Sequence, residues 1–187
     1  MPIEIIKIDY ADVIFDDRGN GAGKLTISDT VNQMNFSYYW GSMGCPLKEF
    51  VASIDQYYFS KNLIGYSESY IMDVKKTFTA VRKRIKEEIP FYEEMEWQKE
   101  LREELKSAQE NCYSEDHFIS QMIGLPEKLW FGHIFHKYDR DSLKSRLEDA
   151  LCEPWHLIEK KESPAAKYLQ DLHKKLKKHI KNEHKPV

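Results

Sequence analysis

Apolar and polar residues alternate through most of the first 40 positions, and this period of two predicts β-strands. In the first apolar run Ile6, Ile8 and Tyr10 share a face, and a bulge or break is expected at Ala11–Asp12. Clusters of Gly, Asn and Asp between the runs are typical of short turns, so the strands should form an antiparallel meander. The three predicted strands cover residues 3–15, 24–28 and 34–40.

After Pro46 the apolar residues recur at steps of three and four, which predicts α-helices almost to the end of the chain. Pro46 suits the first position of a helix, and Ser67 or Ser69 can cap the second. Ser114 and Gly124 are typical of the start and end of a short helix. The expected buried faces are Leu47, Phe50, Val51, Ile54, Tyr57 and Tyr58; Ile71, Val74, Phe78, Val81, Ile85 and Ile89; Phe91, Met95, Gln98, Leu101, Leu105, Ala108 and Cys112; Leu143, Leu147, Ala150 and Leu151; and Ala165, Leu169, Leu172, Leu176 and Ile180, the last set following a cap at Ser163.

Strands that come first and helices that follow are typical of an α+β fold and disfavour a doubly wound parallel sheet. We therefore expect an N-terminal three-stranded antiparallel sheet followed by a mostly helical body. Residues 129–135 are almost wholly apolar, so the pattern leaves helix and strand open there. The length of 187 residues fits a single domain. Its expected parts are the sheet with the first helix (1–63), the helical body (66–160) and a basic C-terminal helix and tail (163–187).

Eight aromatic residues lie between positions 36 and 59, which places the centre of the core where the sheet meets the first helix. Phe36, Tyr38 and Trp40 share one face of the third predicted strand, so we expect Trp40 to be buried. The alternative to a simple core is a ligand groove or partner-binding patch that uses Tyr39 and Ser42 on the turn.

The three cysteines are far apart and odd in number, which favours reduced thiols over a disulfide framework. The N-terminal residues carry an acid early and do not resemble a signal peptide. No apolar run approaches the roughly 18 residues of a membrane span. These features predict a cytoplasmic protein with no membrane contact.

Candidate catalytic residues are few and carry no local signature. The Gly-Ala-Gly-Lys-Leu-Thr run at residues 21–26 lacks the spacing of a phosphate-binding loop and precedes a strand, so we predict no cofactor. Cys45 precedes a predicted helix N-terminus, which would lower a thiol pKa. His133 and His136 are three positions apart but lack the further ligands that a zinc site needs, so no metal site is predicted.

The charges are segregated along a chain whose net charge is only −3. Residues 87–116 carry a net charge of −8, and residues 160–187 carry +6. Such blocks can steer partners, although solvated helix faces are the simpler interpretation. The acidic candidates for protein binding are Glu93, Glu96, Glu100, Glu103 and Glu104, together with Tyr39. The alternative candidates, for nucleic-acid binding, are Lys174, Lys175, Lys177, Lys178 and Lys181.

Two motifs carry a family resemblance: the strand Gly23-Lys24-Leu25-Thr26-Ile27 and the turn Tyr39-Trp40-Gly41-Ser42-Met43-Gly44. With the helix that follows, residues 20–63 resemble small accessory proteins of bacteriophages and prophages, a group without an established function. The resemblance implies expression in the cytoplasm of a bacterial host. By analogy, it also implies a non-enzymatic protein that binds and inhibits a host protein, such as a component of a defence system.

Two other functions stay open at this point. One is a small hydrolase or nuclease that uses Cys45 or the pair His133 and His136. The other is a nucleic-acid-binding accessory protein that acts through the basic C-terminal helix. The sequence does not decide the oligomeric state.

Overall fold

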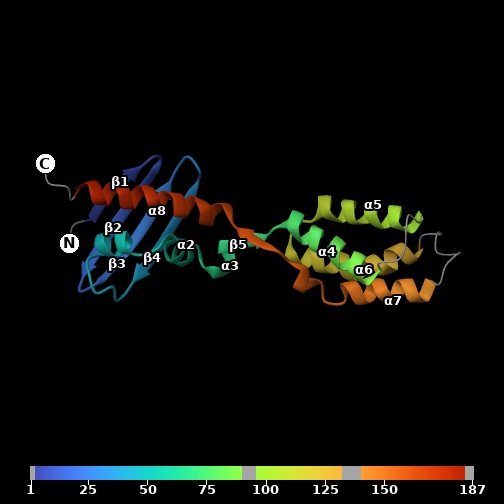
Figure 1. Cartoon of the computed structure of the whole chain (residues 1–187). Helices are drawn as coiled ribbons and strands as arrows, with labels where there is room; N and C mark the ends of the chain where they lie inside the picture. Colours follow the sequence, from blue (N-terminus) through green and yellow to red (C-terminus); the bar gives the residue numbers. More distant parts are fainter. Residues whose placement is uncertain (1–2, 90–95, 132–139, 184–187) are drawn as a thin grey trace. The chain divides into compact units, whose positions relative to one another are not determined.

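Two segments far apart in the sequence, residues 1–71 and 162–187, fold together into one compact unit, and residues 72–161 form a second unit (Figure 1). The computed structural model describes residues 3–89, 96–131 and 140–183. The first unit thus combines the predicted sheet segment with the predicted C-terminal helix. Whether the two units act as the single domain expected from the sequence stays a prediction.

The antiparallel sheet of the first unit has four strands in sequential order, so the prediction of three strands is wrong. The expected first strand is divided by a two-residue turn at Asp9–Tyr10, where Asp9 has a positive φ of 51°. Ile6 and Ile8 are buried as predicted, but Tyr10 lies on the turn and is 64% exposed. The strands are β1 (Ile3–Ile8), β2 (Ala11–Gly19), β3 (Ala22–Asp29) and β4 (Met34–Trp40).

The turn between β2 and β3 is Asn20–Gly21, and both residues have positive φ, as a type I′ hairpin requires. The main chain of this turn contacts the segment after β4, because Met43 N donates a hydrogen bond to Gly21 O at 2.6 Å. A Cβ atom at Gly21 would lie 2.8 Å from Gly44 N. Gly21 therefore allows the turn between β2 and β3 to approach the main chain of the segment after β4 closely.

Three helices cover one face of the sheet: α1 (Leu47–Ser53), α2 (Gln56–Ile64) and α8 (Pro164–Glu183). The sequence pattern predicted one helix where α1 and α2 lie. The break follows from Asp55, whose side chain accepts a hydrogen bond from Tyr58 N at 2.7 Å and caps α2. A short helix, α3 (Tyr66–Ser69), follows.

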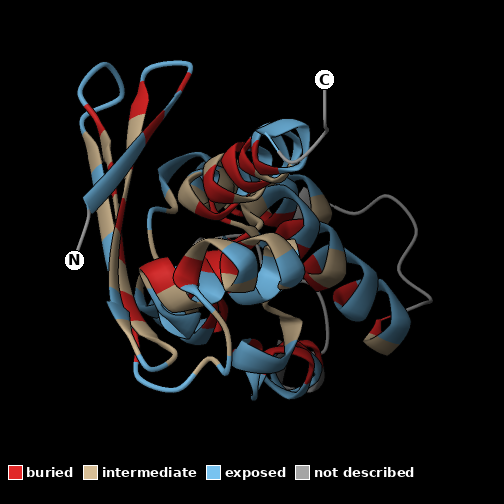
Figure 2. Cartoon of the chain, turned by 90° about the vertical axis from the view of Figure 1, so that its left-hand side faces the viewer, coloured by how far each residue is buried: buried red, intermediate tan, exposed pale blue. Residues whose placement is uncertain are grey.

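The core of the first unit lies between this helical layer and the sheet, and the buried residues of the strands alternate with more exposed ones (Figure 2). Trp40 is 5% exposed, which confirms its predicted burial. Its ring makes edge-to-face contacts with Tyr38 and Phe50, at centroid distances of 4.8 and 5.6 Å. The fully or nearly buried aliphatic residues include Val13, Leu25, Ile27, Leu47, Val51, Leu63, Leu169, Leu172, Leu176 and Ile180.

The chain leaves and re-enters the first unit through two short strands, β5 (Tyr70–Met72) and β6 (Lys160–Glu162), which pair with each other. Backbone hydrogen bonds flank this pair at both ends. Ser163 N donates to Ser69 O at 2.9 Å, and Asp73 N donates to Glu159 O at 2.7 Å. The two connections therefore run antiparallel.

The described residues of the second unit form four α-helices and a short 3-10 helix, η2 (Pro154–Leu157), around a shared core. The first helix is capped by Asp73, whose carboxylate accepts from Lys76 N, and not by Ser67 or Ser69. The third helix of this unit continues through Gly124 and Pro126, so the predicted helix end at Gly124 is wrong. The helix continues because buried Leu125 and Leu129 hold this part of it against the core. The helices are α4 (Val74–Glu88), α5 (Glu96–Asn111), α6 (Glu115–Phe131) and α7 (Arg140–Leu151).

The predicted helical stripes agree with the burial in most of the second unit. Phe78, Val81, Ile85 and Ile89 are buried, and so is the whole predicted set on α7, from Leu143 to Leu151. Of the undecided run at residues 129–135, residues 129–131 belong to α6 and the rest lie outside the described residues.

Candidate functional site: the open face of the sheet

The face of the sheet opposite the helices is exposed, and the strand register defines its residues. We call these twelve residues the open sheet face; none of them is buried. They form three rows across the strands: Ile3, Asp16, Lys24 and Tyr39; Ile5, Ile14, Thr26 and Ser37; and Lys7, Asp12, Ser28 and Asn35.

One corner of the open sheet face is apolar. Ile3 and Ile5 on the edge strand β1 are 64% and 61% exposed, and Ile14 lies directly opposite Ile5 on β2. Exposed aliphatic residues on an edge strand favour association with another chain, and proteins usually avoid them. This apolar corner (Ile3, Ile5 and Ile14) is therefore a candidate contact surface.

At the other edge of the face, Tyr39 on β4 is 49% exposed. The Arg18 guanidinium lies over its ring, 5.5 Å from the centroid, and also donates to Asp16 at 3.1 Å. Tyrosine and arginine are enriched among residues that dominate protein interfaces. Among the predicted site residues, Tyr39 is thus placed on a surface with suitable chemistry.

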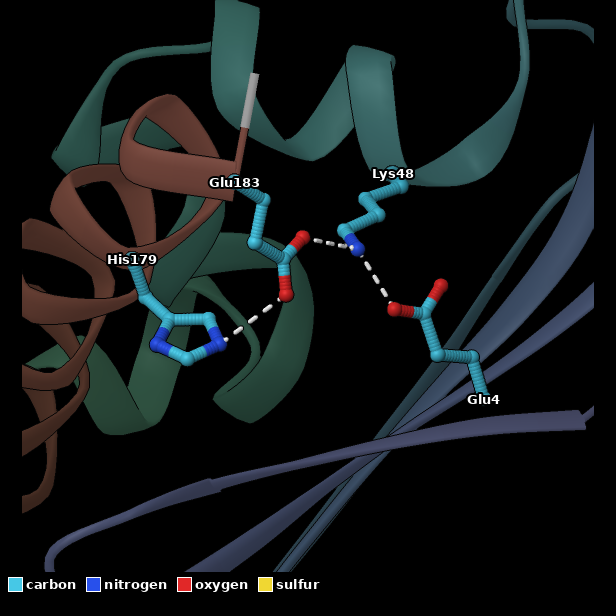
Figure 3. Close-up of polar contacts among 4 residues, drawn as sticks. All are labelled: Glu4, Lys48, His179 and Glu183. Atoms are coloured by element: carbon cyan, nitrogen blue, oxygen red, sulfur yellow. Dashed lines mark hydrogen bonds and ion pairs between the residues drawn. The ribbon is translucent and has the colours of Figure 1, made fainter. Parts of the chain in front are cut away.

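On the helix-covered side, Lys48 links three elements of the first unit (Figure 3). Its Nζ donates to Glu4 on β1 and to Glu183 on α8, each at 2.5 Å, and Glu183 also pairs with His179 at 3.1 Å. Partial burial by itself lowers the pKa of Lys48, but the hydrogen bonds to Glu183 and Glu4 raise it overall. The lysine stays charged and ties β1, α1 and α8 together, so its role is structural.

A pocket of about 560 Å³ lies between α8 and the hairpin turns and includes Tyr10, Asn32 and Lys175 in its lining. At its wall Asp29 accepts hydrogen bonds from the main chain of Val31 and Asn32, from the Asn32 amide and, at 2.6 Å, from the Tyr168 hydroxyl. The Asn32 main chain, followed by Tyr168, lowers the pKa of Asp29 to about 2. Such a carboxylate is a poor proton acceptor near neutral pH, and it serves to anchor the β3–β4 turn to α8.

The acidic candidates lie on or near α5, and the structure places them unequally. Glu93 and the side chain of Glu96 are outside the described residues. Glu103 is exposed, whereas Glu100 is partly buried and Glu104 pairs with Lys128 on α6. Three bases, Lys99, Arg102 and Lys106, are also exposed on α5. The acidic surface is thus interleaved with positive charge, and its role in partner binding stays a prediction.

The five basic candidates on α8 are divided by their contacts. Lys174 pairs with Asp171, Lys175 pairs with Asp9, and the Lys177 ammonium donates to Ile54 O at 2.9 Å. Lys178 and Lys181 are exposed, and within the described part of the chain they have no ion-pair partner. Much of the positive charge predicted for nucleic-acid binding is therefore compensated inside the first unit.

The structure adds little support for the catalytic candidates. The Cys45 thiol contacts Met43 O at 3.8 Å, and His133 and His136 lie outside the described residues. Within residues 3–89, 96–131 and 140–183, no cluster of three or more His, Cys, Asp or Glu is arranged to hold a metal ion.

The helices of the described segments include none that is both long and apolar enough to cross a membrane.

The sequence interpretation missed Ile3, Ile5, Ile14 and Arg18. The available signal was the phase of alternation: Ile3 and Ile5 are out of phase with Ile6 and Ile8, so they had to occupy the opposite face. Local periodicity does not indicate which face of the sheet the helices cover, because packing decides this.

Together these features define an α+β protein whose exposed sheet face is a candidate binding surface. The model of the phage family phiTE_072 matches residues 2–182, and the chain therefore belongs to this phage protein family. The match confirms the phage origin implied by the motifs, and it covers nearly the whole chain. No curated protein and no solved structure matches the chain.

Proposed function

We propose that this phage protein is a non-enzymatic binding protein that engages a protein of the bacterial host through the open sheet face. The observation that carries the proposal is the exposed apolar corner on β1 and β2, on the same face as the Tyr39–Arg18 pair. We further propose that binding inhibits the host protein, which would suit a phage gene directed against a host defence.

The chemistry of the open sheet face supports a protein partner. Its apolar corner offers aliphatic area that a partner would remove from water, at roughly 25 cal/mol per Å². Around it, Lys24 lies opposite Asp16, and Lys7 lies opposite Asp12, so both signs of charge are present in cross-strand pairs. Protein interfaces usually combine apolar and polar surface in this way.

The pocket beside Asp29 supports catalysis less well. Asp29, its most buried acid, has all its hydrogen-bonding oxygens engaged by Val31, Asn32 and Tyr168. A general base must be able to accept a further proton from a substrate. The geometry therefore favours the binding proposal over a hydrolase built on this pocket.

The test compares captured host proteins between two variants of the open sheet face and two matched variants elsewhere. The first pair is Ile5→Lys and Ile123→Lys, since Ile123 is also strongly exposed but lies on α6. The second pair is Tyr39→Ala and Tyr113→Ala, since Tyr113 is an exposed tyrosine of the second unit.

A host protein that binds the open sheet face should bind Ile5→Lys and Tyr39→Ala at least about 10-fold more weakly, as for interface hot spots. The Ile123 and Tyr113 variants should bind as the wild type does. Affinity is measured by calorimetry with the identified partner, and the partner's own activity is assayed with and without the phage protein. Equal binding by all four variants would refute the proposed surface.

A further inference from the structure

Helix α4 of the second unit has a strongly basic exposed face. Its buried stripe is Phe78, Val81 and Ile85, together with Thr77. The remaining surface carries six bases and, toward the C-terminal end, two acids, Glu87 and Glu88. The six bases are Lys75, Lys76, Arg82, Lys83, Arg84 and Lys86, and all are exposed.

Few of these charges are compensated. Arg84 pairs with Glu88 at 3.0 Å, and Lys83 lies 3.8 Å from Glu87, within the same helix. Lys75, Lys76 and Lys86 have no ion-pair partner in the part of the chain that the structure describes. The Asp73 carboxylate caps the helix by accepting a hydrogen bond from Lys76 N. Exposed pairs of this kind contribute little and are screened by salt, so the helix retains a positive field.

Other helices of the same unit distribute their charges differently. Lys128 on α6 pairs with Glu104 on α5, and Lys144 on α7 pairs with Glu127 on α6, so these ion pairs join neighbouring helices. One hydrogen bond between α4 and α5 involves a neutral acceptor, because the Arg82 guanidinium donates to the Gln109 amide oxygen at 2.8 Å. Because Gln109 is neutral, this hydrogen bond holds the Arg82 guanidinium in place without compensating its positive charge.

We propose that α4 binds the phosphate backbone of double-stranded DNA. The helix has 15 residues and is about 22 Å long, a length that follows from 1.5 Å per residue and fits the major groove of B-DNA. Five of its six basic residues line two adjacent stripes, with Lys75, Arg82 and Lys86 in one and Lys76 and Lys83 in the other. Lys and Arg on such a face neutralise phosphates and release counterions.

The composition of this face selects duplex over single strands. Single-strand binders add aromatic rings that stack on bases, and the aromatic ring of α4, Phe78, is buried in the core. The same face lacks the exposed apolar side chains that insert into a lipid surface. The exposed face of α4 is therefore suited to contacts with the phosphate backbone of DNA and not to stacking on bases.

Helix α8 is the natural comparison, since it is the other lysine-rich helix. Its lysines are partly engaged by Asp171, Asp9 and the carbonyl of Ile54. The proposal therefore assigns DNA binding to α4 and not to the C-terminal helix favoured by charge counting. It is independent of the open sheet face, which belongs to the first unit.

The experiment measures fluorescence anisotropy of a labelled duplex of about 20 base pairs with the full-length protein, at several salt concentrations from about 50 mM upward. One variant combines Lys75→Gln, Lys76→Gln, Lys83→Gln and Lys86→Gln. The matched control removes the same number of exposed charges from α8, as Lys167→Gln, Lys174→Gln, Lys178→Gln and Lys181→Gln. Glutamine is a good helix former, so both variants should keep their helices, which circular dichroism checks.

The α4 variant should bind at least about 10-fold more weakly at low salt, and its salt slope should fall by about 0.9 for each phosphate that it no longer neutralises. The α8 variant should stay within about 3-fold of the wild type, since it leaves the basic face of α4 intact. The proposal is overturned if the wild type does not bind the duplex at low salt, or if both variants weaken binding equally. Preference for single-stranded DNA, or for anionic vesicles over the duplex, would overturn it as well.

Discussion

At the scale of single residues, the first unit contains two buried rings that each keep a nitrogen without a hydrogen-bond partner in the described structure: Trp40 at Nε1 and His173 at Nδ1. The histidine stacks on Phe59 with centroids 4.2 Å apart, and its Nε2 donates to Val51 O at 2.8 Å. Because a buried polar atom without a partner costs free energy, both rings must be held by their packing. Each therefore offers a sensitive test of the core.

Replacing Trp40 by alanine should lower the free energy of unfolding by about 3–5 kcal/mol, because a large buried ring leaves a cavity. Trp40→Phe should cost less, since phenylalanine keeps contacts with Tyr38 and Phe50 and removes the unpaired N–H group. Urea unfolding followed by circular dichroism measures both changes. An alanine variant with an unchanged midpoint would mean that Trp40 contributes nothing to the core.

The stability of the first unit should decrease as the pH falls below about 6.5. Burial lowers the pKa of His173, and Lys177 adds to this effect, against the hydrogen bond to Val51, which raises it. The unfolded chain takes up the proton near the ordinary histidine pKa of about 6.5, whereas the folded protein does so only at lower pH. Protonation therefore favours unfolding.

The measurement for His173 is the urea midpoint at a series of pH values, compared with His173→Phe. Phenylalanine can stack on Phe59 but cannot take up a proton, so its midpoint should depend less on pH. The prediction fails if wild type and variant show the same dependence between about pH 5 and 7.

At the scale of secondary-structure elements, contacts distant in the sequence decide where several elements begin. Pro46 precedes α1 but supplies no capping side chain. The Asp17 carboxylate of β2 takes this role: one oxygen accepts from Leu47 N at 2.9 Å and the other from Gly19 N at 2.9 Å. A single side chain thus fixes the bulged end of β2 and the start of α1.

Asp17→Ala should therefore destabilise the protein by about 1 kcal/mol, within the usual 0.5–2 kcal/mol for removal of a helix cap. Asp16→Ala is the matched control, because Asp16 contacts the exposed Arg18 on the open sheet face and should matter by less than about 1 kcal/mol. Thermal or urea unfolding of both variants gives the comparison. Equal effects would show that the cap is not the source of the stability.

The difference between local periodicity and contacts distant in the sequence explains which elements could be predicted from the sequence. Helical stripes such as Phe78, Val81 and Ile85 were predicted correctly because burial follows the helical period directly. The turn at Asp9 and the cap at Asp55 were missed, since an aspartate inside an apolar run carries no local mark of a positive φ or of a capping role. At Gly124 the error was the opposite one: a helix end was predicted, but packing overrides the low helix propensity of glycine and α6 continues.

The candidate surface was predictable to a similar extent. Tyr39 was identified from its place in the aromatic strand. The apolar corner and the basic face of α4 were not, because exposure depends on which neighbours cover a face. The charge blocks of the sequence do not indicate which charges are paired: Glu104 on α5 pairs with Lys128, and Lys175 on α8 pairs with Asp9.

At the scale of the whole molecule, the second unit is inserted at the β5–β6 pair into a chain that otherwise forms the first unit. The insertion enters and leaves at neighbouring points, since Asp73 N donates to Glu159 O at 2.7 Å. Each unit has its own buried cluster of apolar residues. Insertions at such points are often tolerated because both ends lie close together.

Replacing residues 73–159 by Asn-Gly, a type I′ turn, should therefore leave the first unit folded. The deletion also removes Trp97, Trp130 and Trp155, so Trp40 becomes the sole tryptophan and reports directly on this core. Blue-shifted fluorescence with a cooperative urea transition is expected. Emission typical of a water-exposed tryptophan would show that the first unit needs the insertion.

The helix α8, which closes the core of the sheet, also determines the order in which the protein can fold during its synthesis. Residues 1–71 leave the ribosome without Leu169, Leu172, Leu176 and Ile180, the buried residues that α8 contributes. Domains usually complete their folding from the N-terminus onward. Here the helical unit, contained within residues 72–161, is available in full before the sheet unit is. The core of the sheet unit therefore stays incomplete until α8 has been synthesised, and a chain terminated before residue 162 should retain the helical unit alone.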